Sequence, residues 1–216
     1  MRFHRRNNLT KRHLIMLALI LSIAACGITP VSEPPSDDRS SVLPRRVVDS
    51  ASRAEQLRDA GVEPLSGQNI AYTMDRLEAS LRRVFAGSSA SVIREPGRLL
   101  IRSNLSQVIS LQTGNLQPEF TPQLESIAEI LPQFPSVFIE IGVHTDSAGG
   151  QRLNYRNSES QVSLIAEYLL DQNVPASHLV LHAFGESSLL VTEGSAAERA
   201  INYRVEFVFL PVTSNN

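Results

Sequence analysis

The chain has 216 residues, and its hydrophobic content of 42% is enough to build a globular core, so wholesale disorder is not expected. Five of its 20 basic residues, and none of its 22 acidic ones, lie in the first 25 positions. The remainder therefore carries 15 basic and 22 acidic residues, a net charge of about −7. This balance argues against a nucleic-acid partner, which needs a concentrated basic surface.

The N-terminal residues have the three zones of an export signal. A basic stretch from Arg2 to Arg12 precedes an apolar run from Leu14 to Ala25, which is interrupted only by Ser22. Twelve residues make about 18 Å of helix, which is short for a hydrocarbon core of roughly 30 Å. The pattern therefore predicts a signal peptide over residues 1–25.

The end of this apolar run, Ile23-Ala24-Ala25-Cys26, resembles the lipobox of bacterial lipoproteins, whose cysteine becomes the lipidated first residue. Cys26 is the only cysteine and cannot form a disulfide within the chain, and lipidation explains its presence. The alternatives are an ordinary signal peptide that contains a cysteine, or an uncleaved anchor helix. Gly27 stands where lipoproteins retained at the inner membrane have Asp. The resemblance therefore implies anchoring in the lipid of the outer membrane, with the domain facing the periplasm.

Two different segments are expected between Cys26 and the main domain. Residues 26–66 are rich in Pro, Ser, Asp and Arg and lack a sustained apolar period. They predict a flexible tether, with at most a short helix around Ser50 to Ala60. Within residues 67–87, apolar residues recur every three or four positions from Asn69 to Phe85. This pattern predicts an amphipathic helix, which either packs on the following domain, the favoured interpretation, or binds a partner.

Residues 88–211 alternate strand and helix signals, and residues 212–216 form a tail. A hairpin is expected around Glu95-Pro96-Gly97, and a helix is expected to start at Thr121 as N-cap, with Pro122 following. The later elements are a strand, a helix stopped by a left-handed Asn173, a strand, a short helix and a strand, at residues 136–143, 158–172, 179–184, 196–202 and 203–210. This order predicts an α/β (α+β) two-layer sandwich, with a mixed sheet and helices on one face.

Three landmarks occur in order along this domain. They are Gly142-Val143-His144-Thr145-Asp146, then Asn154, and finally Gly185-Glu186 followed by Arg199, Asn202, Arg204, Val205 and Glu206. Together they make residues Asn115 to Leu210 resemble the OmpA-like peptidoglycan-binding domain. Two positions depart from the family pattern nearby: Val143 replaces the usual glycine before His-Thr-Asp, and Tyr203 replaces an arginine.

The resemblance implies a ligand and a site. The ligand is the peptide stem of peptidoglycan, usually through diaminopimelate, whose ammonium is taken by an Asp and whose carboxylate is taken by an Arg fifteen residues later. Asp146 fills the first position, but Gln161 occupies the second. The implied peptidoglycan-binding residues are therefore Asp146, Thr145, Asn154, Gln161 and Arg204.

Gln161 weakens this expectation, because a neutral hydrogen bond contributes less than a charge-assisted one, and affinity drops roughly tenfold or more. Arg152 and Arg156, in the intervening segment, are candidate substitutes for the missing charge. Asp146 has an alternative interpretation as a carboxylate that only fixes its loop. For Asn202 and Arg204 the structural interpretation is favoured, since an arginine at a strand start often pins the neighbouring loop.

No catalytic signature is present, so an enzyme is not expected and no cofactor is implied. His144, His178 and His182 do not predict a metal site, because the motif around His144 binds no metal in the family and no third ligand is predicted near the other two. Two functions remain. The first is a lipoprotein that ties the outer membrane to the wall. The second is a structural subunit of an envelope machine with weakened or lost wall binding, similar in layout to a lipoprotein of the type IVB (Dot/Icm-like) secretion system and bound to its other proteins.

Overall fold

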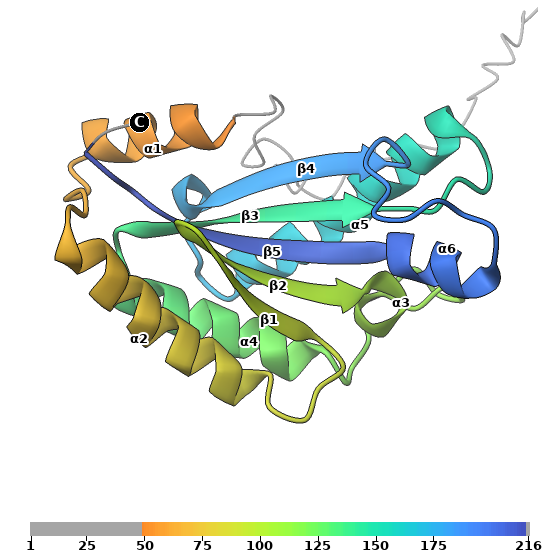
Figure 1. Cartoon of the computed structure of the whole chain (residues 1–216), viewed down its shortest axis with the longest axis horizontal. Helices are drawn as coiled ribbons and strands as arrows, with labels where there is room; N and C mark the ends of the chain where they lie inside the picture. The colour runs from red at the N-terminus through yellow and green to blue at the C-terminus, as the bar shows by residue number, and fades with distance from the viewer. Residues whose placement is uncertain (1–48, 215–216) are drawn as a thin grey trace, which may run out of the picture. The chain divides into compact units, whose positions relative to one another are not determined.

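The computed structural model describes residues 49–214. Their fold is built on a five-stranded mixed sheet with strand order β1-β2-β5-β3-β4 (Figure 1). The expected signal peptide, Cys26 and the tether up to residue 48 lie outside the described residues. No helix between residues 49 and 214 is long and apolar enough to cross a membrane.

The order of elements agrees with the sequence-based expectation. The strands are β1 (Ser91–Glu95), β2 (Arg98–Asn104), β3 (Val137–His144), β4 (Leu179–Gly185) and β5 (Arg204–Pro211). The helices are α1 (Ser50–Asp59), α2 (Gln68–Val84), α3 (Leu105–Val108), α4 (Thr121–Ile130), α5 (Gln151–Asp171) and α6 (Ala196–Asn202), with short 3-10 turns at η2 (Leu131–Gln133) and η3 (Ala176–His178). The β1–β2 hairpin, the amphipathic helix α2 and the left-handed Asn173 (φ 66°) are all confirmed.

The last strand lies in the middle of the sheet. β5 pairs antiparallel with β2 on one side and with β3 on the other. β3 and β4 are parallel, and α5 makes the crossover between them. The carboxyl ends of β3 and β4 therefore meet the start of β5 and the nearby α6 at one end of the sheet, where the family-like residues gather.

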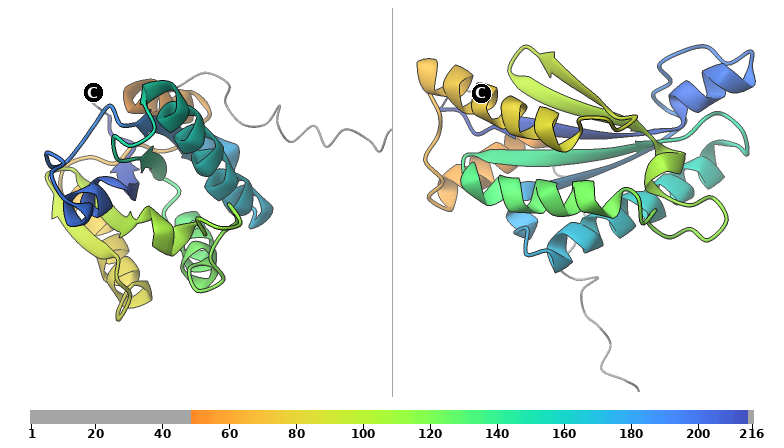
Figure 2. Two further views of the ribbon diagram at one scale, coloured as in Figure 1. Left: turned by 90° about the vertical axis from the view of Figure 1, so that its right-hand side faces the viewer. Right: turned by 90° about the horizontal axis from the view of Figure 1, so that it is seen from below.

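One face of the sheet carries the main core. Alternate residues of β3, such as Ile139 and Ile141, point toward this face and are fully buried. Helices α2, α4 and α5 cover it, as Figure 2 shows from below, and contribute the buried residues Leu77, Leu124 and Ile165. The apolar stripe of α2 thus packs on the domain, as the favoured interpretation predicts.

The opposite face is partly covered by α1, so the expectation of helices on one face only needs correction. Ala54 and Leu57 pack against Phe138 and Val180, which alternate along their strands with the residues of the main core, and against Val212. Two longer-range contacts hold the segment: Arg58 Nη1 donates to the Thr213 carbonyl (2.9 Å), and the Ser136 hydroxyl donates to the Glu63 carbonyl (2.6 Å).

Residues 49–66, assigned to the tether, and residues 212–214, assigned to the tail, are therefore part of the folded unit. The sequence offers little indication that α1 packs on the sheet, because only two of its apolar residues, Ala54 and Leu57, join the apolar cluster.

Two helix starts also differ from the sequence expectation. α5 begins at Gln151 rather than Ser158, directly after Gly149 and Gly150, which both have positive φ. Its first two turns are mostly polar and show no apolar period. α4 has Phe120 at the N-cap position instead of Thr121, whose hydroxyl donates to the Pro118 carbonyl (2.9 Å).

The packing of α1 is testable by truncating its buried contact. Leu57→Ala should lower the free energy of unfolding by about 2–4 kcal/mol, because it leaves a cavity against Phe138 and Val212. The neighbouring exposed substitution Gln56→Ala should change it by less than about 0.5 kcal/mol. Urea denaturation of both variants measures the difference. Equal stability of the two variants would show that α1 is not part of the folded unit.

Candidate functional site

Asp146 lies in the loop that follows β3 and is half-buried. Its Oδ1 accepts a hydrogen bond from the Ala148 backbone N–H (3.2 Å), which fixes the loop locally. The other carboxylate oxygen, Oδ2, has no hydrogen-bond partner among residues 49–214 and is available to a ligand. Loop fixing and ligand binding are therefore compatible roles for this one side chain.

Thr145, directly before Asp146, is held in place by the sheet. Its backbone N–H donates to the Gly185 carbonyl (2.8 Å), which ties the end of β3 to the end of β4. The side chain is only 3% exposed, and its Oγ1 is buried with no partner within the described part of the chain. Thr145 therefore positions Asp146 rather than offering an open contact.

Asn154, on the first turn of α5, is buried and joins two loops. Its Nδ2 donates to the Asp146 carbonyl (3.1 Å) and to the Glu186 carboxylate. Both amide hydrogens are thereby used inside the protein. We therefore assign Asn154 the role of positioning the Asp146 loop against α5 and the loop after β4.

The landmark glycine after β4 has a steric reason. Gly185 has φ +52°, and a Cβ there would lie 2.9 Å from the Tyr155 backbone nitrogen, so the strand end could not approach α5 so closely with a side chain. The Ser158 hydroxyl accepts the Gly185 N–H (3.0 Å) and donates to the Tyr155 carbonyl (2.8 Å). Helix α5 thus holds the ends of both parallel strands.

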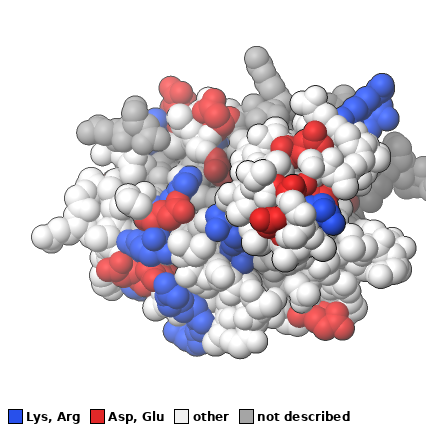
Figure 3. Space-filling view, turned by 45° about the vertical axis from the view of Figure 1, so that its right-hand side comes forward, with Lys and Arg blue, Asp and Glu red and all other residues white. Residues whose placement is uncertain are grey.

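The loop between β4 and α6 is tied back to the Asp146 loop. Glu193 accepts hydrogen bonds from the Ser147 hydroxyl (2.5 Å) and from Asn202 Nδ2 (2.8 Å). Asn202 is fully buried, and its Oδ1 accepts the backbone N–H groups of Leu190 and Val191. Figure 3 brings this end of the molecule forward, with several acidic side chains on its surface.

Gln161 and Tyr203 face each other in a separate hollow. Gln161 Nε2 donates to the Tyr203 hydroxyl (3.1 Å). Burial raises the pKa of Tyr203 above its ordinary value; the hydrogen bond from Gln161 opposes this, and the negative charge of Asp146 adds to it. The charge of Asp146 therefore acts on Tyr203, although Asp146 follows β3 and Tyr203 lies between α6 and β5.

The candidate substitute arginines are not in that hollow. Arg152 and Arg156 are exposed and, together with Gly149 and Gly150, line another hollow at the start of α5. Among the residues that line the hollow of Gln161, none is basic. The structure thus gives the missing family arginine no replacement there.

Arg204 also lies away from that hollow and makes internal contacts. It is 3% exposed, and its guanidinium donates to the carbonyls of Ser188 and Asn202 (3.2 Å each) and to Glu206 (2.9 Å). An arginine with these partners pins the loop after β4, as the structural interpretation expects.

Glu206 is the centre of a charged cluster on the sheet face opposite the main core. Its Oε1 accepts from Arg102 Nε (2.8 Å) and Arg204 Nε (2.9 Å), and His144 Nε2 lies 3.6 Å from its Oε2. Burial raises the pKa of Glu206, but its interactions with His144 and the two arginines outweigh this and hold the pKa far below its usual range.

His144 is buried beside this cluster and stacks on an aromatic ring. The His144 and Phe184 rings are nearly parallel, with centroids 4.4 Å apart, and burial lowers the pKa of His144. A Cβ at Gly142 would lie 2.9 Å from the Phe184 ring, which explains a glycine at this position. Val143 points into the main core instead, so the displaced glycine serves the stacking.

Most of the candidate site lies within a segment that matches a known family. Residues 111–203 match the model of the OmpA family. The chain carries an OmpA C-terminal-like domain.

Curated relatives extend the similarity beyond the family match. The Escherichia coli (strain K12) protein named "Probable lipoprotein YiaD" is 28% identical over 146 residues, which cover 68% of this chain and 67% of YiaD. Outer membrane porin F of Pseudomonas fluorescens is 25% identical over 51% of this chain and 34% of the porin. Peptidoglycan-binding protein ArfA of Mycobacterium tuberculosis (strain H37Rv) is 27% identical over 39% of this chain and 26% of ArfA. The chain thus spans about a third or less of the latter two proteins.

Solved structures support the fold. A MotB-like protein from Desulfovibrio vulgaris aligns with a TM-score of 0.58 at 19% identity, over 73% of this chain and 98% of that one. The cell wall anchor of the T6SS from Pseudomonas aeruginosa aligns with a TM-score of 0.53 at 21% identity, over 61% and 96%. The expectation that the chain is not an enzyme agrees with these relatives, whose names describe a lipoprotein, a porin and wall-binding proteins.

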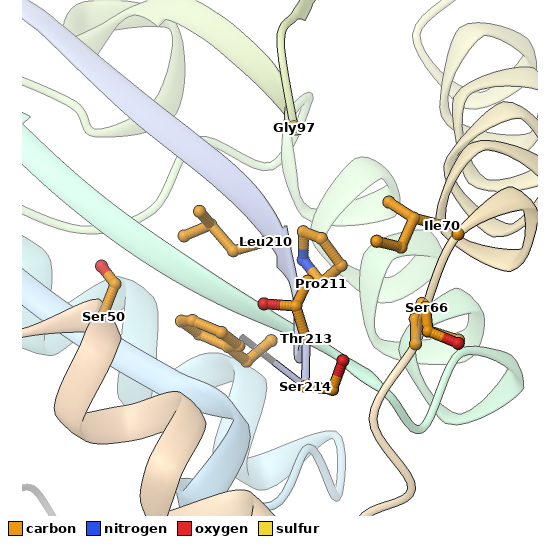
Figure 4. Close-up of a pocket in the computed structure, with 11 residues that line it drawn as sticks. Ser50, Ser66, Ile70, Gly97, Leu210, Pro211, Thr213 and Ser214 are labelled. Carbon is orange, nitrogen blue, oxygen red and sulfur yellow. The ribbon is translucent and has the colours of Figure 1, made fainter. Parts of the chain in front are cut away.

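A further hollow of about 510 Å³ lies at the other end of the sheet from the OmpA-like site. Figure 4 shows Ile70 of α2 pointing toward Pro211 at the end of β5, with Thr213 and Ser214 beside them. No charged side chain lines it.

Within residues 49–214, no group of three or more His, Cys, Asp or Glu side chains is placed to hold a metal ion.

The charged cluster makes stability depend on acid. Because the folded pKa of Glu206 lies below its unfolded value of about 4.3, its contribution is present above that pH and is lost as pH falls below it. Glu206→Gln should lower the free energy of unfolding at pH 7 by about 3 kcal/mol, since it leaves Arg204 buried without its partner. The loss should shrink on acidification from pH 5 to pH 2.

Urea denaturation across that pH range measures both effects. Glu95→Gln is the matched control, because it removes the same charge from an exposed pair with Arg98 and should cost about 1 kcal/mol or less. A parallel pH profile for the two variants would contradict the assigned role of Glu206.

Proposed function

We propose that the chain is a lipid-anchored protein of the bacterial outer membrane whose periplasmic OmpA-like domain binds peptidoglycan non-covalently and links the membrane to the wall. The observation that carries this proposal is the Asp146 carboxylate. One of its oxygens has no partner among the described residues, while Thr145 and Asn154 hold its loop in place. A fixed, half-buried carboxylate suits the ammonium of a diaminopimelate residue.

The names of the relatives support a role at the wall. ArfA is named a peptidoglycan-binding protein, and the Pseudomonas aeruginosa structure is described as a cell wall anchor. These properties are stated for those proteins, and the domain similarity supports carrying them to this chain. The names of YiaD and porin F, a lipoprotein and an outer-membrane protein, support an envelope location.

The lipid anchor rests on the sequence around Cys26. The basic and apolar zones before it, and Gly27 after it, match an outer-membrane lipoprotein signal. Several acyl chains on one residue give stable anchoring, because each buried CH₂ contributes about 0.8 kcal/mol.

A second candidate function is favoured by Gln161. With no basic residue lining its hollow, the site offers no charged partner for a carboxylate, and wall binding through that group is weakened. A domain of this kind serves equally as a structural subunit of an envelope machine, such as a type IVB-like secretion apparatus. Its partners would then be other envelope proteins.

Co-sedimentation with isolated sacculi tests the first function. The full chain in detergent at low salt should pellet with sacculi, and Asp146→Ala should reduce the pelleted fraction at least tenfold because it removes the group that pairs with the ammonium. Glu159→Ala is the matched control, since it removes one exposed carboxylate from α5 and should pellet like the wild type. Failure of the wild type to pellet would favour the structural subunit.

Membrane fractionation tests the anchor. Cys26→Ala should release the protein from membranes into the soluble periplasmic fraction, because the acylated residue is lost. Ser22→Ala, within the apolar run, should remain in the membrane fraction. If the Cys26→Ala protein still required detergent for release, lipidation of this residue would be wrong.

A further inference from the structure

We propose that the hollow of Gln161 and Tyr203 binds a neutral primary carboxamide rather than a free carboxylate, so that the domain selects amidated peptide stems. The inference rests on the peptidoglycan binding proposed above and names the form of the stem that the site accepts. It depends on the donors and acceptors that line the hollow and on the charge beside it.

The hollow has no charged side chain in its lining, which is made of polar residues together with the apolar Ile109, Leu111 and Leu164. Its volume is about 320 Å³, and α5 contributes three polar side chains to its wall, those of Asn157, Ser160 and Gln161. Tyr203 lines it from the segment between α6 and β5. A carboxylate entering this site would lose water and meet no positive charge in return, which is costly.

The hydrogen-bonding groups within the hollow are incompletely paired. Gln161 Oε1 is buried and has no hydrogen-bond partner in the described part of the chain. A buried acceptor in this state is unfavourable and calls for an N–H donor from a ligand. The Tyr203 hydroxyl already accepts from Gln161 Nε2, so its own hydrogen is free to be donated. Burial raises the pKa of Tyr203, which keeps that hydrogen in place at neutral pH.

A primary carboxamide carries an N–H donor and a carbonyl acceptor. It therefore complements a site in which an unpaired acceptor lies beside an available donor. Because Gln161 Oε1 is buried, the Gln161 side chain must turn slightly for the carboxamide N–H to reach it. The carboxamide oxygen accepts from the Tyr203 hydroxyl. A carboxylate presents acceptors only, so it would satisfy Tyr203 but leave Gln161 Oε1 facing another acceptor. The pairing pattern therefore discriminates between the two forms of one ligand group.

The charge of Asp146 points to the same choice. Burial is the main cause of the raised pKa of Tyr203, and the negative charge of Asp146 adds to it. That charge repels a carboxylate and attracts an ammonium. A ligand that satisfies both sites carries an ammonium and a carboxamide, as does a diamino acid of the stem whose side-chain carboxylate is amidated. The N-acetyl groups of the glycan present the same amide chemistry but no ammonium, so the stem is favoured.

Calorimetric titration of the full chain in detergent tests the selection. The probes are a stem tripeptide ending in diaminopimelate, the same peptide with the side-chain carboxylate amidated, and the N-acetylated glycan disaccharide. The amidated peptide should bind roughly tenfold more tightly than the free carboxylate form. Gln161→Arg should reverse that order, because a guanidinium pairs with a carboxylate and cannot accept a hydrogen bond. Tyr203→Phe should weaken the amidated peptide several-fold while retaining the ring.

Each outcome decides a separate point. Preference of the wild type for the free carboxylate, or for the disaccharide, would overturn the carboxamide selection. So would equal affinities of the wild type for the two peptides. If neither peptide bound while the protein still pelleted with sacculi, the selection would be wrong and the wall-binding function would stand. If pelleting was also lost, the proposed function itself would fail.

Discussion

The buried amide of Asn154 is the contact on which the arrangement of the site depends. Its two hydrogens join the loop of Asp146 to the loop after β4, across the first turn of α5. One turn later, Ser158 binds the Gly185 backbone, which approaches α5 closely because it has no side chain. The Asp146 carboxylate is thereby held by a long helix and by two paired strands, rather than by a free loop. Such support keeps a binding group oriented before the ligand arrives.

The charged cluster around Glu206 extends this support to the opposite face of the sheet. Helix α1 packs at the end of that face marked by Phe138 and Val180. Toward the site, the same face carries Arg102, Arg204 and Glu206, and both arginines are bound to Glu206. Arg204 links the cluster to the loop after β4 through the Ser188 carbonyl. A buried network of this kind fixes one geometry because breaking any member leaves an unpaired charge.

Local signals in the sequence predicted most of the fold. The Pro96-Gly97 turn, the apolar run of β3, the alternation in β5 and the spacing of the family landmarks predicted the hairpin, the sheet and the position of Asp146. The docking of α1 was missed because Ala54 and Leu57 are its only residues in the apolar cluster, and two residues set no clear period. The contact between Gln161 and Tyr203 was missed for a different reason. The two residues are 42 positions apart, and no local pattern connects them.

That contact bears on whether the hollow has lost its ligand or accepts a different one. A site that served only as scaffold would be more stable with apolar side chains at both positions, since a buried acceptor without a partner costs about 1–3 kcal/mol. Instead, Gln161 keeps such an acceptor, and Tyr203 keeps a donor beside it. Polar groups left unpaired in a defined hollow are expected where a ligand completes them. The presence of Gln161 in place of the family arginine is therefore better explained as a change in the group that is bound than as the decay of a binding site.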